Sequence, residues 1–579
     1  MHSDSAKQCA VEGVSLAFPD APERKVLDQI HLSIRKGESV LLLGPSGSGK
    51  STLGYVLGGL IPRSIEAVVT GNVRVEGRVG MLFQDPEAQF CMLTAEDEIA
   101  FGLENIRIPR REMETRIDAA LERFGLMSWK RRNSAEMSGG MKQKLAMACL
   151  LAMEPDIYIF DEPTANLDPA STRDVLRAIR ELKQTESKTL LIIEHKVEGV
   201  IDWVDRAVLL GPDGRLLDEG MPGEVFRRRQ AEIRAYGIWQ PTLWKWSSRL
   251  NPTAPFPTTT KQFVDAVDSG QVPQLVELLD RETGALTAAS PAAASLQDLD
   301  PIGKVPLFRA ENASFSYGKG HKVWGPISFD INAGEWVAIV GPNGCGKSTL
   351  LSALMGLRNL SEGTIRLKER PLDSYSGREI SQLLGFVFQN PEHQFITDTV
   401  WQEVAFGTGA PTNPEVKERV RETLVDLGLI HAANANPFSL SQGEKRRLSV
   451  ATTLLSSHEA LLLDEPTFGQ DAHTAFELEE KLADLHQQGR TLIMVTHDME
   501  LVARRAQKVL VLAGGNLLYC GHPADLFRME ESEDSAAAEA SGLLRTANLE
   551  LPLAFKVRAL LERKGGLLHA GLAAGEPVR

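Results

Sequence analysis

A glycine-rich sequence that occurs twice constrains this chain of 579 residues more than any other feature. GPSGSGKST occupies residues 44–52, and GPNGCGKST occupies residues 341–349, which is 297 positions further along. Further phrases recur in the same order: FQDPEAQF and FQNPEHQF, MSGGMKQ and LSQGEKR, IFDEPTANLD and LLDEPTFGQD, IIEHK and MVTHD. An ordered series of matches indicates an internal duplication. We therefore predict two tandem copies of one domain, at residues 7–235 and 305–528.

The segments outside the two copies differ from them in composition. Residues 236–304 begin with a Trp-rich stretch, continue with helix-like apolar spacing over KQFVDAVDSGQVPQLVELLD, and end in TAASPAAAS. We interpret them as a linker that contains short helices. Residues 529–579 are predicted to form an acidic spacer, MEESEDSAAAEAS, followed by a C-terminal helix. LELPLAFKVRALLERK near Pro552 loosely resembles GIWQPTLWKWSSRL near Pro241, so each copy is expected to carry a small helical appendage.

The composition excludes several classes of function. With 43% hydrophobic and 24% charged residues the chain is an ordinary globular protein. A net charge of −14 argues against nucleic acid as a partner. Five scattered cysteines without a Cys-x-x-Cys pair predict neither disulfides nor a cysteine metal site, and they fit a reducing cytoplasm. We expect no signal peptide and no membrane-spanning helix, so any work at a membrane needs a partner.

Each glycine-rich sequence lies between an apolar run and a helical pattern. Strands such as SVLLLG, DIYIFDE and TLLIIEH alternate with helices, which predicts an α/β fold with a mostly parallel sheet and ligands at the carboxyl ends of its strands. Gly-x-x-x-x-Gly-Lys-Ser in this context is the phosphate-binding loop, whose backbone N–H groups surround phosphates. Lys50 and Lys347 are expected to reach the β- and γ-phosphates of ATP, and Ser51 and Ser348 to bind Mg²⁺.

Two further groups of residues predict ATP hydrolysis. Apolar strands end at Asp161-Glu162 and at Asp464-Glu465, where the aspartates are expected in the Mg²⁺ shell and the glutamates beside the attacking water. A histidine follows each glutamate after 33 and 32 residues, at His195 and His497. The matched spacing assigns both histidines to sensing the γ-phosphate.

Taken together, these motifs resemble the ATP-binding cassette (ABC) ATPases over about 450 residues. The resemblance implies that the fold is two tandem cassettes, each a mostly parallel sheet with a helical subdomain, which pair head to tail within one chain around two ATP molecules. Phe18 and Tyr317 would stack on adenine, and Asp168 and Asp471 would be the dimer-contact aspartates. The implied catalytic residues are Glu162, Glu465, His195, His497, Gln84 and Gln389. The implied Mg²⁺ residues are Ser51, Ser348, Gln84, Gln389, Asp161 and Asp464.

The resemblance also implies the set of nucleotide-binding residues. Each signature segment would face the ATP held by the phosphate loop of the other copy. The set is Gly44, Pro45, Ser46, Gly47, Ser48, Gly49, Lys50, Ser51 and Thr52; Gly341, Pro342, Asn343, Gly344, Cys345, Gly346, Lys347, Ser348 and Thr349; Phe18 and Tyr317; Ser138, Gly139 and Gly140; and Ser441, Gln442 and Gly443.

The chain departs from the family's usual Leu-Ser-Gly-Gly-Gln signature. Met137 and Met141 stand in the first copy, and Gln442 and Glu444 in the second. The side chain of Gln442 replaces a glycine, so hydrolysis at the site of Lys50 could be slower, with neutral variation as the alternative. Because both glutamates and both histidines are present, we predict two hydrolytic sites.

FQDPEAQF with EIAFG, and FQNPEHQF with EVAFG, most closely resemble the ATPases of energy-coupling-factor (ECF) importers of vitamins and metal ions. The resemblance implies an integral membrane transmission subunit and a small substrate-binding membrane subunit as partners, and a peripheral position on the cytoplasmic face of the membrane. Gln89, Phe90, Gln394 and Phe395 are the candidate coupling residues. The tandem signatures favour the hydroxymethylpyrimidine (thiamine precursor) subgroup, while cobalt or another vitamin stays open.

Two other classes remain as alternatives. A tandem ATPase of a binding-protein-dependent importer usually has a degraded second site, whereas this second copy is intact. A soluble two-cassette translation factor usually has a highly charged linker or an iron-sulfur domain, and this chain has neither.

Overall fold

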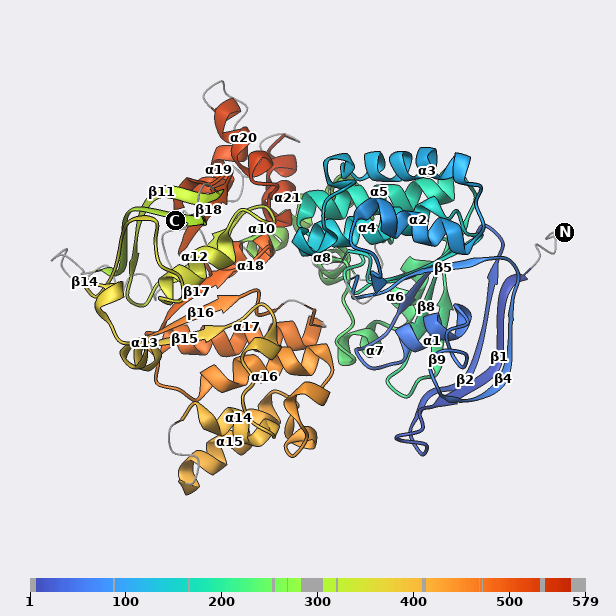
Figure 1. Ribbon diagram of the computed structural model, residues 1–579, viewed down its shortest axis with the longest axis horizontal. Coiled ribbons are helices and arrows are strands. Elements are labelled where there is room, and N and C mark those ends of the chain that lie inside the picture. Colours follow the sequence, from blue (N-terminus) through green and yellow to red (C-terminus); the bar gives the residue numbers. More distant parts are fainter. Residues whose placement is uncertain are drawn as a thin grey trace, which may run out of the picture. The chain divides into compact units, whose positions relative to one another are not determined.

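The computed structural model describes residues 7–86, 89–164, 167–251, 256–267, 269–282, 306–318, 321–408, 413–467, 469–470, 472–531 and 537–563. The chain divides into two compact units, a first built mainly from residues 1–248 and a second built mainly from residues 259–470 and 474–579. The colours of Figure 1 follow the first unit from blue to green and the second from green to red.

The first unit contains two sheets. A six-stranded sheet has the order β5-β6-β7-β3-β8-β9, in which only the β8–β9 pair is antiparallel. A three-stranded antiparallel sheet has the order β2-β1-β4. The strands are β1 (Lys7–Ala17), β2 (Lys25–Arg35), β3 (Ser39–Leu43), β4 (Val68–Val75), β5 (Val79–Leu82), β6 (Ile157–Asp161), β7 (Thr189–Ile193), β8 (Arg206–Leu210) and β9 (Leu216–Gly220).

The helices of the first unit pack on both faces of its larger sheet or on one another. They are α1 (Lys50–Leu57), α2 (Ala95–Asn105), α3 (Arg110–Arg123), α4 (Gly139–Ala152), α5 (Pro169–Gln184), α6 (Pro222–Arg228), α7 (Gln230–Ala235) and α8 (Thr242–Leu250). Alternate residues of β6 pack on opposite faces, as a strand period of two requires. Ile157 and Ile159 lie in the core with α1, and Tyr158 and Phe160 lie in the core with α4 and α5.

The second unit repeats this plan. Its six-stranded sheet has the order β15-β16-β17-β12-β18-β19, again with one antiparallel pair at the end, and a four-stranded sheet has the order β11-β10-β13-β14. The strands are β10 (Pro306–Tyr317), β11 (His321–Asn332), β12 (Trp336–Val340), β13 (Glu362–Leu367), β14 (Arg370–Pro371), β15 (Leu384–Val387), β16 (Ala460–Asp464), β17 (Thr491–Val495), β18 (Lys508–Ala513) and β19 (Asn516–Gly521).

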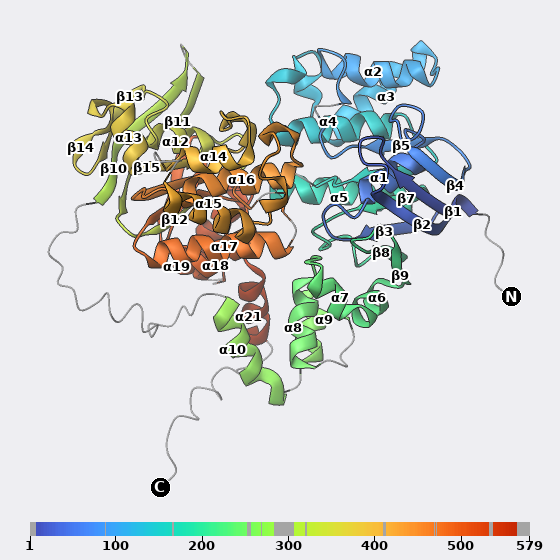
Figure 2. The same ribbon diagram turned by 90° about the horizontal axis from the view of Figure 1, so that it is seen from below.

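The helices of the second unit include two from the segment between the copies. They are α9 (Thr260–Ala266), α10 (Val272–Glu282), α12 (Lys347–Leu354), α13 (Gly377–Leu383), α14 (Val400–Phe406), α15 (Pro414–Asp426), α16 (Gln442–Leu454), α17 (Ala472–Gln487), α18 (Met499–Arg505), α19 (Pro523–Glu531), α20 (Ala537–Thr546) and α21 (Leu553–Arg563). Helices α9 and α10 pack against α21, and α10 also packs against α18. Figure 2 shows α10 beside α21.

The acidic segment after the second copy is more structured than the sequence predicts. We expected a disordered spacer over MEESEDSAAAEAS, but α19 continues to Glu531 and α20 begins at Ala537. The alanines explain the difference because alanine has the highest helix propensity. The linker sequence TAASPAAAS lies outside the described residues.

Candidate functional site

The two phosphate loops have nearly the same geometry. Strand β3 ends just before Gly44 and α1 begins at Lys50, so the loop connects the carboxyl end of a central strand to a helix N-terminus. Gly49 has φ +90°, and a Cβ there would lie 2.8 Å from the carbonyl oxygen of Val26. Only glycine fits this backbone. Gly346 has φ +94° and is equally confined, by the side chains of Val323 and Trp324.

The loop lysines fold back onto their own loops. Lys50 Nζ donates hydrogen bonds to the carbonyl oxygens of Gly44 and Pro45, each at 2.9 Å. Lys347 Nζ makes the same pair of contacts, also at 2.9 Å, with Gly341 and Pro342. Both lysines are buried in the loops they are expected to serve, with 7% and 6% of their residue surface exposed.

A buried aspartate at the end of a strand in each copy fits a divalent cation. Asp161 is fully buried, and neither of its carboxylate oxygens makes a hydrogen bond of normal geometry. Burial raises its pKa to about 6, a shift that the nearby Ser51 hydroxyl and Lys50 ammonium oppose. Asp464 behaves alike: burial raises its pKa to about 6, with Ser348 opposing, and its Oδ1 has no partner. A buried carboxylate with spare lone pairs beside a serine hydroxyl suits Mg²⁺, which prefers oxygen ligands.

Two of the predicted residues contact the first glutamate, Glu162. His195 Nε2 lies 3.0 Å from Glu162 Oε1. Gln84 Nε2 donates to Glu162 Oε2, also at 3.0 Å. Although burial favours the neutral form, the His195 imidazole holds the pKa of Glu162 below its usual value. The glutamate is thus kept as a carboxylate, which is the form that can accept a proton from water.

The second glutamate has the same contact with a histidine as the first, but the described residues show no matching contact with a glutamine. His497 Nε2 lies 3.0 Å from Glu465 Oε1, at an angle outside that of a normal hydrogen bond. As in the first copy, this histidine lowers the pKa of Glu465 against the effect of burial. The Gln389 side chain is exposed. Arg446 instead donates to the backbone carbonyl groups of Phe388, at 2.7 Å, and of Gln389.

Both glutamates have an unusual backbone conformation. The φ angle is +50° at Glu162 and +51° at Glu465, in the left-handed region that non-glycine residues rarely adopt. The N–H of Glu162 donates to the carbonyl oxygen of Ile193 at 2.9 Å, and that of Glu465 to Val495 at 3.0 Å. These bonds hold each turn against the end of the neighbouring strand, two residues before His195 or His497. Such strain is often concentrated at catalytic positions.

Comparisons with known proteins identify the family of this chain. A family model described as ABC transporter matches residues 27–165 and 325–468. The YkoD protein of Bacillus subtilis (strain 168), provisionally named an HMP/thiamine import ATP-binding protein, is 39% identical over 569 residues, covering 95% of this chain and 96% of that protein. A provisionally named ABC transporter ATP-binding protein of Methanosarcina mazei is 34% identical, covering 91% and 90%. The chain belongs to the ABC transporter family. It is an ATPase with two cassettes of the P-loop ABC fold.

One solved structure is also similar in sequence. It is cbiO1 from Clostridium perfringens, described as part of the ABC transporter complex cbiONQ. It is 29% identical and covers 44% of this chain and 98% of its own chain, with a TM-score of 0.35.

The signature segments of this ABC ATPase begin helices in both cassettes. Ser138 caps α4, whose first residues are Gly139 and Gly140. Ser441 caps α16, which begins with Gln442 and Gly443. In the second cassette Glu444 completes a capping box, in which the Glu444 N–H donates to the Ser441 hydroxyl at 3.4 Å and the Ser441 N–H donates to Glu444 Oε2 at 2.9 Å. Met141, which stands at the equivalent position of the first cassette, has no carboxylate that could accept such a bond. The departures at Met141 and Glu444 therefore have different effects on the start of the helix.

The remaining predicted nucleotide contacts lie at equivalent points. Phe18 directly follows β1 and is half-buried, and Tyr317 ends β10 with 48% of its surface exposed. The Tyr317 ring also packs edge-on against Phe315. Asp168 caps α5 by accepting from the Ser171 N–H at 2.8 Å. Asp471 lies outside the described residues.

The candidate coupling residues are less accessible than their neighbours. Phe395 is only 8% exposed, and Gln394 Nε2 donates to the Ser449 carbonyl oxygen at 2.9 Å. Phe90 packs against the core of the first cassette, and Gln89 Nε2 is buried. The accessible apolar side chains are instead Leu93 and Ile396, which are 74% and 69% exposed.

Two buried glutamates from the EIAFG and EVAFG phrases explain how these loops are held. Glu98 Oε2 accepts from the N–H groups of Cys91 and Met92, at 2.9 and 2.7 Å. Glu403 Oε2 accepts from Ile396 and Thr397 in the same way, at 3.0 and 2.8 Å. The carboxylates thereby fix the loops that present Leu93 and Ile396.

Sequence reasoning missed a buried carboxylate at the first site. Glu194 lies between β7 and His195, and its Oε1 accepts from the N–H and the hydroxyl of Thr164, at 3.0 and 2.6 Å. Burial raises its pKa to about 7, and the neighbouring Glu162 adds to the rise. The second cassette has Thr496 at this position. The difference between IIEH and MVTH was the only signal in the sequence.

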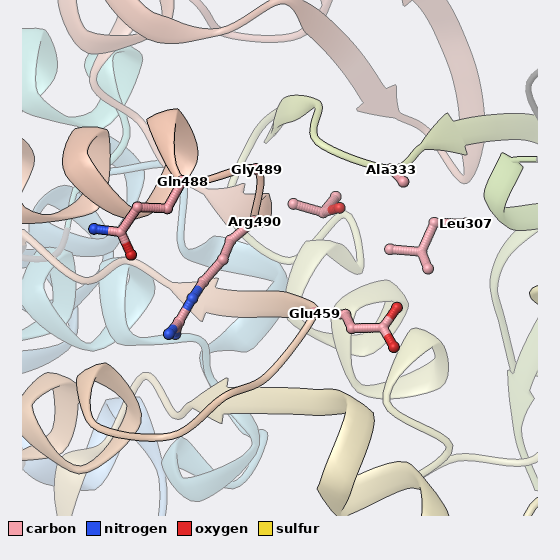
Figure 3. Close-up of a pocket in the computed structure, with 7 residues that line it drawn as sticks. Leu307, Ala333, Glu459, Gln488, Gly489 and Arg490 are labelled. Atoms are coloured by element: carbon pink, nitrogen blue, oxygen red, sulfur yellow. The ribbon is translucent and has the colours of Figure 1, made fainter.

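A hollow elsewhere in the second cassette does not belong to this site. It lies at the amino-terminal ends of β16 and β17, whereas the phosphate loop follows the carboxyl end of β12. Figure 3 shows the side chains of Gln488 and Arg490 directed away from Leu307 and Ala333. The lining residues are Leu307, Ala333, Glu459, Gln488, Gly489, Arg490 and Thr491.

Within the described part of the chain, no helix is both long and apolar enough to cross a lipid bilayer.

Proposed function

We propose that this ABC ATPase is the energy-coupling subunit of an ECF-type importer, with hydroxymethylpyrimidine or thiamine as the favoured cargo. The observation that carries the proposal is the pair of Lys–Asp–Glu–His constellations, which supports two hydrolytic sites. Similarity to YkoD over 95% of the chain supports the cargo class. The FQNPEHQF and EVAFG phrases support the importer class.

In this proposal the cassettes keep the predicted bounds, residues 7–235 and 305–528, and pair around two ATP molecules. Each signature segment faces the nucleotide held by the other cassette. Phe18 and Tyr317 stack on adenine, and Asp168 and Asp471 contact the opposite cassette.

The chain's own residues divide the chemistry as follows. Lys50 and Lys347 leave their loop carbonyls to bind the β- and γ-phosphates. Glu162 and Glu465, held ionised, orient the attacking water and take its proton. His195 and His497 donate a hydrogen bond to the γ-phosphate in this proposal.

Magnesium would be held at each site by a serine, a glutamine and an aspartate. When bound, Mg²⁺ neutralises the charge that develops on the phosphate oxygens. The proposed residues are Ser51, Gln84 and Asp161 in the first cassette and Ser348, Gln389 and Asp464 in the second.

The proposed partners are an integral membrane transmission subunit and a small membrane subunit that captures the cargo. They would place the chain on the cytoplasmic face of the membrane. The exposed Leu93 and Ile396, together with the loops that follow Gln84 and Gln389, form the proposed contact with the transmission subunit.

The test is affinity purification of the tagged chain from gently solubilised membranes, with mass spectrometry of whatever co-purifies. We expect a polytopic membrane protein and a small membrane protein. Uptake of labelled hydroxymethylpyrimidine or thiamine into cells should also be lost in the Glu162→Gln, Glu465→Gln variant. A permease pair with a soluble binding protein, or ribosomes, would overturn the importer class, and uptake of cobalt alone would overturn the cargo.

A further inference from the structure

Each cassette contains the same link between its sensor histidine and its C-terminal helix. The link starts from a glutamate three residues after the histidine. Glu198 Oε1 accepts from the N–H of Thr242 at 3.1 Å and from its hydroxyl at 3.4 Å. Glu500 Oε1 accepts from the N–H of Leu553 at 2.6 Å.

The two acceptors and the two donors occupy equivalent positions. Thr242 is the first residue of α8, and Leu553 is the first residue of α21. Each directly follows a proline, Pro241 or Pro552, in the loosely matching sequences. The first N–H groups of a helix have no partner within it, and a carboxylate there is also favoured by the helix dipole. The loose sequence match therefore corresponds to one contact made twice.

Both C-terminal helices are anchored to their own cassettes by aromatic side chains. Trp244, 1% exposed, lies in the buried core of the first unit with Phe226, and it also packs against Phe256 with ring centroids 5.1 Å apart. Phe555, 3% exposed, packs against Phe527 at 4.9 Å. In the second cassette Arg558 also pairs with Asp280 of α10 at 2.5 Å. A group bound to either helix is therefore bound to a fixed structure.

The segment between histidine and glutamate is itself well held. In the second cassette Asp498 caps α18 by accepting from the N–H groups of Glu500 and Leu501, at 3.0 and 3.1 Å. The Asp498 N–H donates to the Thr496 hydroxyl at 3.0 Å, so bonds flank His497 on both sides. In the first cassette the Lys196 ammonium lies 6.0 Å from the centre of the Trp239 ring, just ahead of α8.

We propose that Glu198 and Glu500 are positioning residues for ATP hydrolysis, through which the C-terminal helix of each cassette orients the sensor histidine against the catalytic glutamate. The helix fixes the glutamate, and the short segment before the glutamate fixes His195 or His497 at 3.0 Å from Glu162 or Glu465. The dependence is stronger in the second cassette because Glu500 is partly buried, whereas Glu198 is exposed.

The proposal gives the second link a pH signature. Burial raises the pKa of Glu500 to about 7. The charged groups that face it are Asp498 and Arg504 around α18 and Glu282 on α10, while the Leu553 N–H of α21 stabilises its charged form. As pH falls through 7 the carboxylate gains a proton and becomes a weaker acceptor for the helix N–H. The link is strongest above that pH.

The sharpest test removes only the donor. Leu553→Pro deletes the N–H, and proline is tolerated at the first position of a helix. Leu553→Ala is the matched control, because it shortens the side chain but keeps the N–H. In the full-length chain we expect Leu553→Pro and Glu500→Ala each to lower kcat by about threefold to tenfold, with the KM for ATP unchanged. The double variant should lose no more than either single variant, because both remove the same bond.

A second readout does not depend on turnover. Hydrogen exchange of residues 496–501, measured without nucleotide, should be faster in Leu553→Pro than in Leu553→Ala. Glu500→Gln keeps an acceptor oxygen but cannot ionise, so it should match the wild type at pH 6 and fall about threefold below it at pH 8. Thr242→Pro against Thr242→Ala should show the same pattern with a smaller effect.

Three results would overturn the proposal: unchanged kcat and exchange in Leu553→Pro, equal losses in Leu553→Pro and Leu553→Ala, or additive losses in the double variant. Thermal unfolding verifies that each variant is folded. If Glu500→Ala does not fold, Glu500→Gln and Leu553→Pro carry the test. None of these measurements involves the cargo or the membrane partners, so failure of the importer proposal leaves this one intact.

Discussion

The two candidate ATP sites share their predicted catalytic residues but differ in the residues around them. In the first cassette Gln143 is fully buried and donates to the Pro163 carbonyl oxygen at 3.1 Å. Its counterpart in the second is Arg446, a buried guanidinium whose charge is balanced by Asp464 and Glu465. The first site also has the extra carboxyl of Glu194, where the second has Thr496. The two copies thus have the same candidate reacting groups, but the first has an extra buried carboxyl beside them and the second has an extra buried guanidinium.

We predict that both sites hydrolyse ATP but respond differently to substitutions and to pH. The largest expected effect comes from Glu162→Gln and Glu465→Gln. Each should slow hydrolysis at its own site by about 100-fold or more, because the altered side chain cannot accept a proton. Single-turnover ATPase measurements on the two single variants and the double variant check this. If one single variant kept the full wild-type rate, its site would be silent, and the prediction of two hydrolytic sites would be wrong.

Arg446→Gln should destabilise the second cassette. The change leaves the carbonyl oxygens of Phe388 and Gln389 without their donor, which costs about 1–3 kcal/mol of unfolding free energy. Thermal or urea unfolding measures the loss. Lys481→Ala is the control, because it removes a more exposed ion pair with Asp426 and should cost far less. Equal losses in the two variants would show that Arg446 has no special structural role.

Exchanging the residues at positions 194 and 496 should move a pH dependence of folding stability from the first cassette to the second. The folded-state pKa of Glu194, about 7, is above that of a free carboxyl. Its contribution to stability is therefore fully present at acidic pH and is lost as pH rises through 7. Glu194→Thr should remove that loss from the first cassette, and Thr496→Glu should introduce one in the second. Unfolding midpoints between pH 5 and 8 test both, and Glu194→Gln separates charge from hydrogen bonding.

The smallest expected effect concerns a cysteine in the second phosphate loop, Cys345. Burial raises the pKa of Cys345, which is 9% exposed, so alkylation of this loop cysteine should be slow at neutral pH and faster at higher pH. Once modified, the loop should not bind ATP, and bound ATP should protect it. Cys345→Ser should keep nearly full activity, because Ser48 holds the equivalent place in the first loop. Mass spectrometry must separate Cys345 from the exposed Cys91 and Cys520. Full activity after complete modification of Cys345 would contradict the prediction.

The α/β fold and the main site could be predicted because their signals are contiguous. Lys50, Asp161-Glu162 and His195 each follow an apolar strand, and parallel strands bring such positions to one edge of a sheet. The bond from Gln84 to Glu162 spans 78 residues, and its absence at Gln389 could not be predicted from two equally good FQ motifs.

What the sequence did not reveal depends on tertiary contacts. Glu198 and Glu500 are ordinary acidic residues until α8 and α21 pack beside them, and Arg446 is one of several basic residues in KRR. Phe395 belonged to a motif that suggested contact with a partner, but its side chain fills the core of the helical subdomain. Ile396, the next residue along the chain, is exposed and is therefore the residue we propose for that contact.

Helices α9 and α10 have a consequence for synthesis on the ribosome. Their buried side chains, including Phe263, Leu275 and Leu279, belong to the second unit together with α21, which begins at Leu553. At roughly 5–20 residues per second, the ribosome needs tens of seconds after α10 to deliver its partner helix. Until α21 emerges, the nascent chain therefore holds α9 without the helix that it packs against, and a chaperone would have that time to bind it.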